Sequence, residues 1–174
     1  MTSIGPYSQK TDSTYMFNFK DIHGPFPKKI ENSNSISDII CNNSFFKKFK
    51  YILNLSKLDS IYNDIQANFT IFVTSDDFLK YIPESFFVNM DLVTARNIIQ
   101  ASTLENRITS DILKDSKCSF FTSMNKYNRL YIKNNNNNNN IILNNNINVI
   151  QKDIICTNGI IHIIDSLIIP EINI

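Results

Sequence analysis

The sequence is poor in the residue types from which phosphate, metal and disulfide sites are usually built. It has only three glycines among 174 residues, and they form no Gly-rich phosphate loop. Its three cysteines, Cys41, Cys118 and Cys156, lie far apart, and an odd number cannot form a closed disulfide framework. One bridge with a free thiol and three reduced thiols both fit the sequence. Because only His23 and His162 could add imidazole, we predict no metal site and no cofactor.

Charge is scarce as well. The chain carries 17 basic and 16 acidic residues, a net charge of +1, and charged residues make up only 19% of it. This balance gives no electrostatic attraction to nucleic acid or to an anionic membrane. The sequence also predicts no transmembrane segment, because no apolar run is long enough to cross a bilayer. Residues 1–20 lack the apolar core of a signal peptide, so the compartment stays open.

The length of the chain and the change in its composition near residue 34 predict one domain with an N-terminal extension. Residues 1–34 contain Gly-Pro pairs and form the expected N-terminal extension, and residues 35–174 form the domain. In the extension Tyr15, Phe17 and Phe19 alternate with other residues in a period-two pattern. One interpretation is an arm that packs against its own domain. The other is an edge strand or docking peptide that places these aromatic side chains on a partner.

The first half of the domain is predicted to be mainly helical. Apolar residues recur at helical spacing in several short segments, and in the segment after Asp91 we expect Leu92, Ala95, Ile98 and Ile99 to face inward. Side chains that can accept hydrogen bonds from free helix N–H groups stand before these segments: Ser35 or Ser37, Asn43 or Ser44, the run 74–77, and Asp91. One strand, at 68–73, interrupts the helices.

The second half is predicted to be β-structure. Strands are expected at 119–123, 130–133, 141–143, 147–150 and 160–164, and the Asn-rich tract 134–140 is expected to be a hairpin loop. The last strand is β-branched and apolar, so we predict that both of its faces are buried. Helices followed by antiparallel strands indicate an α+β fold.

Two stretches resemble the signature motifs of fasciclin domains. Residues 70–83 resemble the first signature, Thr-Val-Phe-Ala-Pro-Thr-Asp-Glu-Ala-Phe followed by Leu-Pro, and residues 158–170 resemble the second, Asn-Gly-Val-Ile-His-Val-Ile-Asp followed by Leu-Leu-Pro. The chain departs from the first signature at Thr74, where the family has Pro, and at Phe78, where it has Ala. The matching structural positions are Thr70, Phe72, Ser75, Asp76, Asn158, Gly159, His162, Asp165 and Pro170.

The resemblance implies a fold and a class of function. The implied fold is a wedge of antiparallel, sandwich-like β-sheets with helices packed mainly from the N-terminal half. The implied function is a non-catalytic protein-interaction or cell-adhesion module, secreted or on a cell surface, similar to the periostin-like and transforming-growth-factor-beta-induced-like adhesion domains. Its partner would be a protein.

The resemblance also points to candidate partner-binding residues. In adhesion proteins of the family, a Tyr-His pair is implicated in integrin contact, but Ala101-Ser102 stands at that place here. The resemblance therefore gives no support for an integrin partner through this pair. Residues 151–155, which include Asp153 and Ile154, are similar to a segment tied to integrin binding in periostin-like proteins. Alternatively, Asp153-Ile154 is simply how the family ends a strand.

The sequence gives little indication of catalysis. His162 and Asp165 are the one candidate catalytic pair, but residues three apart in a strand point to opposite faces. We therefore predict that they form no dyad and that the protein is not an enzyme. Two other functions fit the sequence: a structural subunit of an intracellular or organellar assembly anchored by Tyr15, Phe17 and Phe19, and a small-ligand or carbohydrate binder that uses a cleft between helices and sheet.

Overall fold

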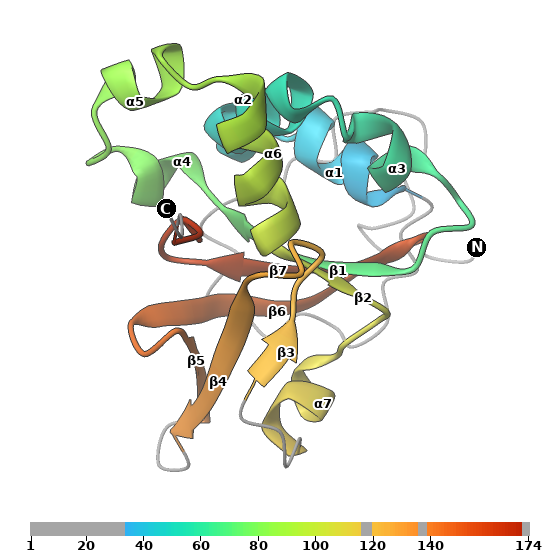
Figure 1. Cartoon of the computed structure of the whole chain (residues 1–174). Coiled ribbons are helices and arrows are strands. Elements are labelled where there is room, and N and C mark those ends of the chain that lie inside the picture. Colours follow the sequence, from blue (N-terminus) through green and yellow to red (C-terminus); the bar gives the residue numbers. More distant parts are fainter. Residues whose placement is uncertain (1–33, 116–119, 136–138, 172–174) are drawn as a thin grey trace, which may run out of the picture.

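The computed structural model describes residues 34–115, 120–135 and 139–171, which form a layer of short helices against one curved sheet (Figure 1). The helices are α1 (Ile36–Asn42), the 3-10 turn η2 (Ser44–Phe46), α2 (Lys47–Ser56), α3 (Asp59–Asn63), α4 (Asp76–Leu79), α5 (Glu84–Val88), α6 (Leu92–Ala101) and α7 (Ser110–Asp115). The strands are β1 (Phe69–Thr74), β2 (Thr103–Glu105), β3 (Phe120–Thr122), β4 (Arg129–Asn135), β5 (Asn140–Leu143), β6 (Ile147–Cys156) and β7 (Gly159–Ile164). The α+β prediction is confirmed.

Three of the predicted helix starts are capped as expected. Ser35 and Asp38 form a reciprocal capping box at α1, Asn43 accepts a hydrogen bond from a backbone N–H of η2, and Asp91 caps α6 by accepting from the Thr94 N–H at 2.7 Å. These side chains satisfy N–H groups that have no partner within their helices.

The run 74–77 behaves differently from the prediction. Helix α4 begins after Ser75, but the Ser75 side chain makes no capping hydrogen bond. Instead the Asp76 carboxylate accepts from the backbone N–H groups of Lys47 and Lys48, at 3.2 and 2.9 Å. Because η2 and the start of α2 lie beside α4, Asp76 satisfies the free donors of the neighbouring helix rather than those of its own.

The seven strands form one sheet in the order β2-β1-β7-β6-β5-β4-β3. The prediction of antiparallel strands is wrong for one neighbouring pair, since β1 and β7 run parallel from Phe69↔Gly159 to Thr74↔Ile164. A parallel pair needs a long crossover, and here it is the whole chain between β1 and β7. An isolated bridge from Leu104 to Ser123 links the two ends of the order and nearly closes the sheet. The predicted sandwich-like sheets are therefore one curved sheet.

Strand β7 is buried on both faces, as predicted, because it lies between two apolar cores. Ile161 and Ile163 belong to the core beneath the helices, and Ile164 belongs to a second core inside the curve of the sheet. Figure 1 shows helices α1–α6 gathered over β1 and β7, with α7 apart from them near β3. The predicted inward face of α6 is confirmed except at Leu92, which is 38% exposed because it is the first residue of the helix.

The hairpin predicted around the Asn-rich tract is present, but its strands reach into the tract. Asn134 pairs with Ile141 and Asn135 with Asn140. Residues 136–138 lie outside the described residues, as do residues 1–33, so the aromatic arm stays a prediction.

Candidate functional site

Asn158 joins three parts of the chain at the start of β7. Its Oδ1 accepts from the Ile36 N–H at 2.8 Å, and its Nδ2 donates to the carbonyls of Tyr62 and Asp64, at 2.8 and 3.0 Å. The side chain is completely buried. The three hydrogen bonds of this amide therefore all go to backbone groups of the domain, at the start of α1 and the end of α3.

The next residue, Gly159, is a glycine because no side chain would fit beside β1. A Cβ atom at this position would lie 2.1 Å from the Phe69 carbonyl oxygen and 2.7 Å from Cδ1 of Ile36. Its φ angle is not positive, so the backbone conformation itself does not require glycine. Close approach of two parallel strands requires it.

His162 is buried in β7 and both ring nitrogens are used. Nδ1 accepts from the Asp153 N–H at 3.2 Å, and Nε2 lies 2.9 Å from the Ile108 carbonyl oxygen. These partners define a neutral ring with its proton on Nε2. Burial lowers the pKa of His162, opposed by its hydrogen bond to Ile108. Phe72 stacks on the ring with centroids 5.4 Å apart.

The lowered pKa of His162 predicts that stability falls on acidification. Above the unfolded value of about 6.5 the ring is neutral in both states. Below it the unfolded chain binds a proton that the folded chain resists, so the free energy of unfolding should fall, by at most about 1.4 kcal/mol per pH unit. Urea unfolding between pH 5 and 8 measures this slope. In His162→Gln the slope between pH 5 and 6.5 should largely disappear, and an unchanged slope would contradict the assignment.

Asp165 is partnered separately from His162. Its carboxylate accepts from the backbone N–H and the side-chain Nδ2 of Asn148, at 2.8 and 2.7 Å, and so joins the end of β7 to β6. The two residues use different partners, and the structure places no His162–Asp165 dyad, in agreement with the strand-parity argument.

Thr70 and Asp153 hold the segment before α7 onto the sheet. The Thr70 hydroxyl donates to the Asn106 carbonyl and accepts from the Ile108 N–H. The Asp153 carboxylate accepts from both the backbone N–H and the hydroxyl of Ser110. Asp153 has a positive φ of 58°, at a register shift in β6. This bulge directs its carboxylate towards α7.

The candidate partner-binding pair is therefore engaged within the domain. Ile154 is 3% exposed and lies in the core beneath the helices. The Asp153 carboxylate already accepts two hydrogen bonds. This placement favours the interpretation that the pair shapes the strand. Ala101 and Ser102 are also fully buried at the end of α6, with the Ser102 hydroxyl donating to the Ile98 carbonyl.

The described residues offer little for catalysis or metal binding. They contain no group of three or more His, Cys, Asp or Glu side chains that could hold a metal ion. Burial raises the pKa of the Cys156 thiol to about 12, so this thiol is protonated at neutral pH. Cys41 and Cys156 are free thiols, and Cys118 lies outside the described part of the chain. No helix within the described ranges is long and apolar enough to cross a membrane.

Exposed apolar side chains recur between the end of α4 and the start of α6. Figure 1 shows α5 at the outer end of the helical layer, away from the sheet. We call Tyr81, Val88, Leu92 and Val93 the α5 surface. Tyr81, Val88 and Val93 are 83%, 70% and 62% exposed, and Leu92 lies beside Val93 in sequence. Single exposed apolar residues are normal, but several within one short segment mark a candidate interaction surface. The hydrophobic periodicity of the sequence did not reveal this surface. It places Leu92 on the inward face of α6 and does not take into account that Leu92 is at the end of the helix.

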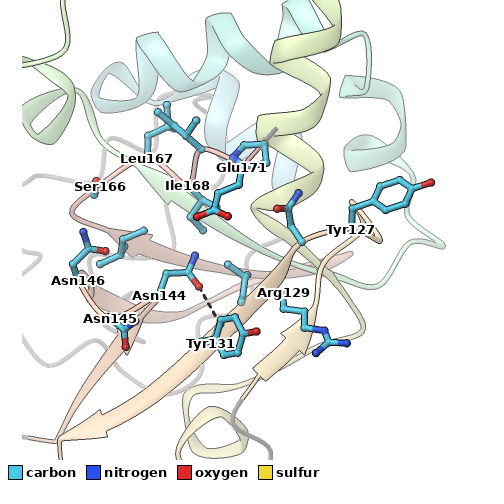
Figure 2. Close-up of a pocket in the computed structure, with 15 residues that line it drawn as sticks. Tyr127, Arg129, Tyr131, Asn144, Asn145, Asn146, Ser166, Leu167, Ile168 and Glu171 are labelled. Atoms are coloured by element: carbon cyan, nitrogen blue, oxygen red, sulfur yellow. Dashed lines mark hydrogen bonds between the residues drawn. The ribbon is translucent and has the colours of Figure 1, made fainter. Parts of the chain in front are cut away.

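A second candidate site is a polar pocket of about 720 Å³. It lies between the start of β4, the β5–β6 turn at 144–146, and the segment 166–171 that follows β7 (Figure 2). Asn144 and Glu171 project into it, whereas the side chains of Tyr127 and Arg129 point away from it. No motif in the sequence indicated this pocket, because asparagine is common throughout the chain.

Comparisons with known proteins agree with the signature motifs. The fasciclin domain family model matches residues 44–170. Among solved structures, the chain is similar to a FAS1 domain pair from the insect cell adhesion molecule Fasciclin I, with 20% sequence identity and a TM-score of 0.66. The match covers 79% of this chain and 51% of that chain, so this chain spans about half the length of the domain pair. No curated protein sequence matches.

Proposed function

Since this chain belongs to the fasciclin domain family, we propose that it is a non-catalytic module that binds a protein partner in cell adhesion. The observation that carries the proposal is the family match over residues 44–170, nearly the whole of the predicted domain. The contacts of the signature residues His162, Asp165 and Asn158, and those of Asp153, add support, because these side chains hold the fold together and leave no reactive pair between them.

The α5 surface is the part of the domain we propose for partner contact. Its side chains are exposed and apolar, and they come from the stretch between the end of α4 and the start of α6. Burial of such side chains against a partner provides the main driving force for association. The engaged carboxylate of Asp153 makes the segment 151–155 a weaker candidate for the same role.

Cell attachment to a surface coated with the full-length protein tests this proposal. We expect attachment, and we expect Val88→Glu to reduce it at least tenfold because a charge would enter the interface. Ile65→Glu is the matched control, since Ile65 is 71% exposed, like Val88 at 70%, but lies between α3 and β1. Equal attachment of both variants and the wild type would exclude the α5 surface. No attachment at all would count against adhesion.

The aromatic arm provides the competing proposal of an intracellular assembly subunit. Microscopy of the endogenous protein separates the two: surface staining of intact cells supports adhesion, and staining only after permeabilisation supports the assembly. In that second case, replacing Tyr15, Phe17 and Phe19 by serine in the full chain should abolish co-purification with the assembly.

A further inference from the structure

We propose that the pocket beside the β5–β6 turn binds a neutral oligosaccharide. This inference is independent of the α5 surface and of the protein partner. The pocket volume of about 720 Å³ lies within the range of about 300–1,000 Å³ that is typical of small-molecule sites. It lies towards the upper end of that range, and so suits a ligand larger than a single sugar ring.

The polar groups of the pocket match the chemistry of sugars. Three consecutive amides, Asn144, Asn145 and Asn146, line it together with the Ser166 hydroxyl and the Glu171 carboxylate. A side-chain amide carries donors and an acceptor in one plane, and each sugar hydroxyl both donates and accepts. Adjacent hydroxyls of a sugar ring can therefore be bound in pairs by such groups.

The turn that carries the three amides is already fixed in place. Asn144 and Asn145 have positive φ angles of 49° and 71°, a conformation that asparagine tolerates and that suits a tight hairpin turn. Asn144 donates its backbone N–H to the Tyr131 carbonyl at 2.9 Å, and its Oδ1 accepts from the Tyr131 N–H at 3.0 Å. The Asn144 NH₂ group is thus turned towards the pocket (Figure 2). A ligand would not have to order this turn, which lowers the cost of binding.

The pocket also offers apolar contact to the C–H groups of a sugar ring. Leu167, Ile168 and Ile169 belong to its lining, and Ile169, which is 56% exposed, presents the most apolar surface of the three. Sugars combine hydroxyl edges with apolar ring faces, so a mixed lining of this kind fits them.

The charges of the pocket argue against an anionic ligand. The cation in its lining, Arg129, lies over the Phe120 ring at 4.5 Å and points away from the cavity. Glu171 would repel a phosphate, sulfate or sialic acid group. The competing occupant is an extended peptide, but its binding usually relies on deep apolar pockets for anchor side chains. This lining is mostly amide, hydroxyl and carboxylate instead.

The test uses the full chain on an array of neutral oligosaccharides built from hexoses and N-acetylhexosamines, with sialylated and sulfated members as comparison. We expect binding to at least one neutral structure and weaker binding to its sialylated form. Titration calorimetry with that oligosaccharide should then show at least a tenfold loss of affinity for Asn145→Gly. Glycine keeps the positive φ and removes only the amide.

Asn106→Gly is the matched control, because Asn106 is also exposed, has a φ of 81° and lies outside the pocket. The affinity of Asn106→Gly for the oligosaccharide should equal that of the wild type. Ser166→Ala provides a second variant that does not touch the turn, and it should weaken binding by several fold. Absence of binding to every neutral oligosaccharide would overturn the proposal, and so would unchanged affinity in both pocket variants. Capture of the chain by an immobilised peptide array through Asn145 and Ser166, with no sugar bound, would assign the pocket to a protein ligand instead.

Discussion

Replacing Gly159 by alanine is expected to cost about 4 kcal/mol or more of unfolding free energy, a large part of the roughly 5–15 kcal/mol that stabilises an ordinary domain. The new methyl group would lie 2.1 Å from the Phe69 carbonyl oxygen, which is backbone and cannot rotate away. Relief requires β7 to separate from β1, and this parallel pair lies between both cores. Urea unfolding monitored by far-ultraviolet circular dichroism measures the loss.

The control for this variant is Thr157→Ala in the same turn. Thr157 is exposed, and its described hydrogen bonds involve only its backbone. The free energy of unfolding of Thr157→Ala should therefore differ from that of the wild type by no more than about 0.5 kcal/mol. If Gly159→Ala were as stable as the wild type, the close approach of β1 and β7 would be wrong. Failure of Gly159→Ala to accumulate as folded protein, with Thr157→Ala normal, agrees with the expected loss.

Asn158→Ala is expected to cost about 3–4 kcal/mol, the second largest effect we anticipate. Alanine removes three hydrogen bonds at once and leaves the Ile36 N–H and the Tyr62 carbonyl without this partner. Each buried polar group left unsatisfied costs about 1–3 kcal/mol, and the Asp64 carbonyl should cost least because it is on an exposed residue and still accepts from the Ala67 N–H. The same urea titration gives the value.

Two further variants show whether the amide itself matters. Asn158→Asp keeps the size of the side chain and the acceptor for the Ile36 N–H, but it loses both donors and places a carboxylate against two carbonyls. It should remain strongly destabilised at neutral pH. Asn54→Ala on the exposed side of α2 should be near neutral, since alanine favours helix. A cost below about 1 kcal/mol for Asn158→Ala would show that water replaces the amide.

These two residues explain why the second signature is so specific. Asn158 supplies hydrogen bonds that a buried turn needs, and Gly159 supplies room for the neighbouring strand. His162 and Asp165 then attach β7 to Ile108, Asp153 and Asn148. Because the signature stabilises the fold, we look for function on the α5 surface and in the pocket, which use none of these four side chains.

Most of the secondary structure could be predicted from the sequence because it depends on local chemistry. Ser35, Asn43 and Asp91 cap helices that begin within one turn of them. The run at 160–164 is β-branched except for His162 and does not alternate with exposed polar residues, so it was predicted to be buried on both sides. Strand β2 and helix α7 were missed, since each is short and is held by distant partners such as β1 and Asp153.

The sequence alone determined the family, the α+β class and the strand at the centre of the core, because motif spacing and hydrophobic pattern are properties of neighbouring residues. Only the tertiary structure decided that β1 and β7 run parallel, that Asp76 caps α2 rather than its own helix, and that Asp153 faces Ser110. The α5 surface and the pocket at Asn144–Asn146 also emerged only there. The physical reason is the same for all of them: each depends on which distant segments the folded chain brings into contact, and no local pattern encodes that choice.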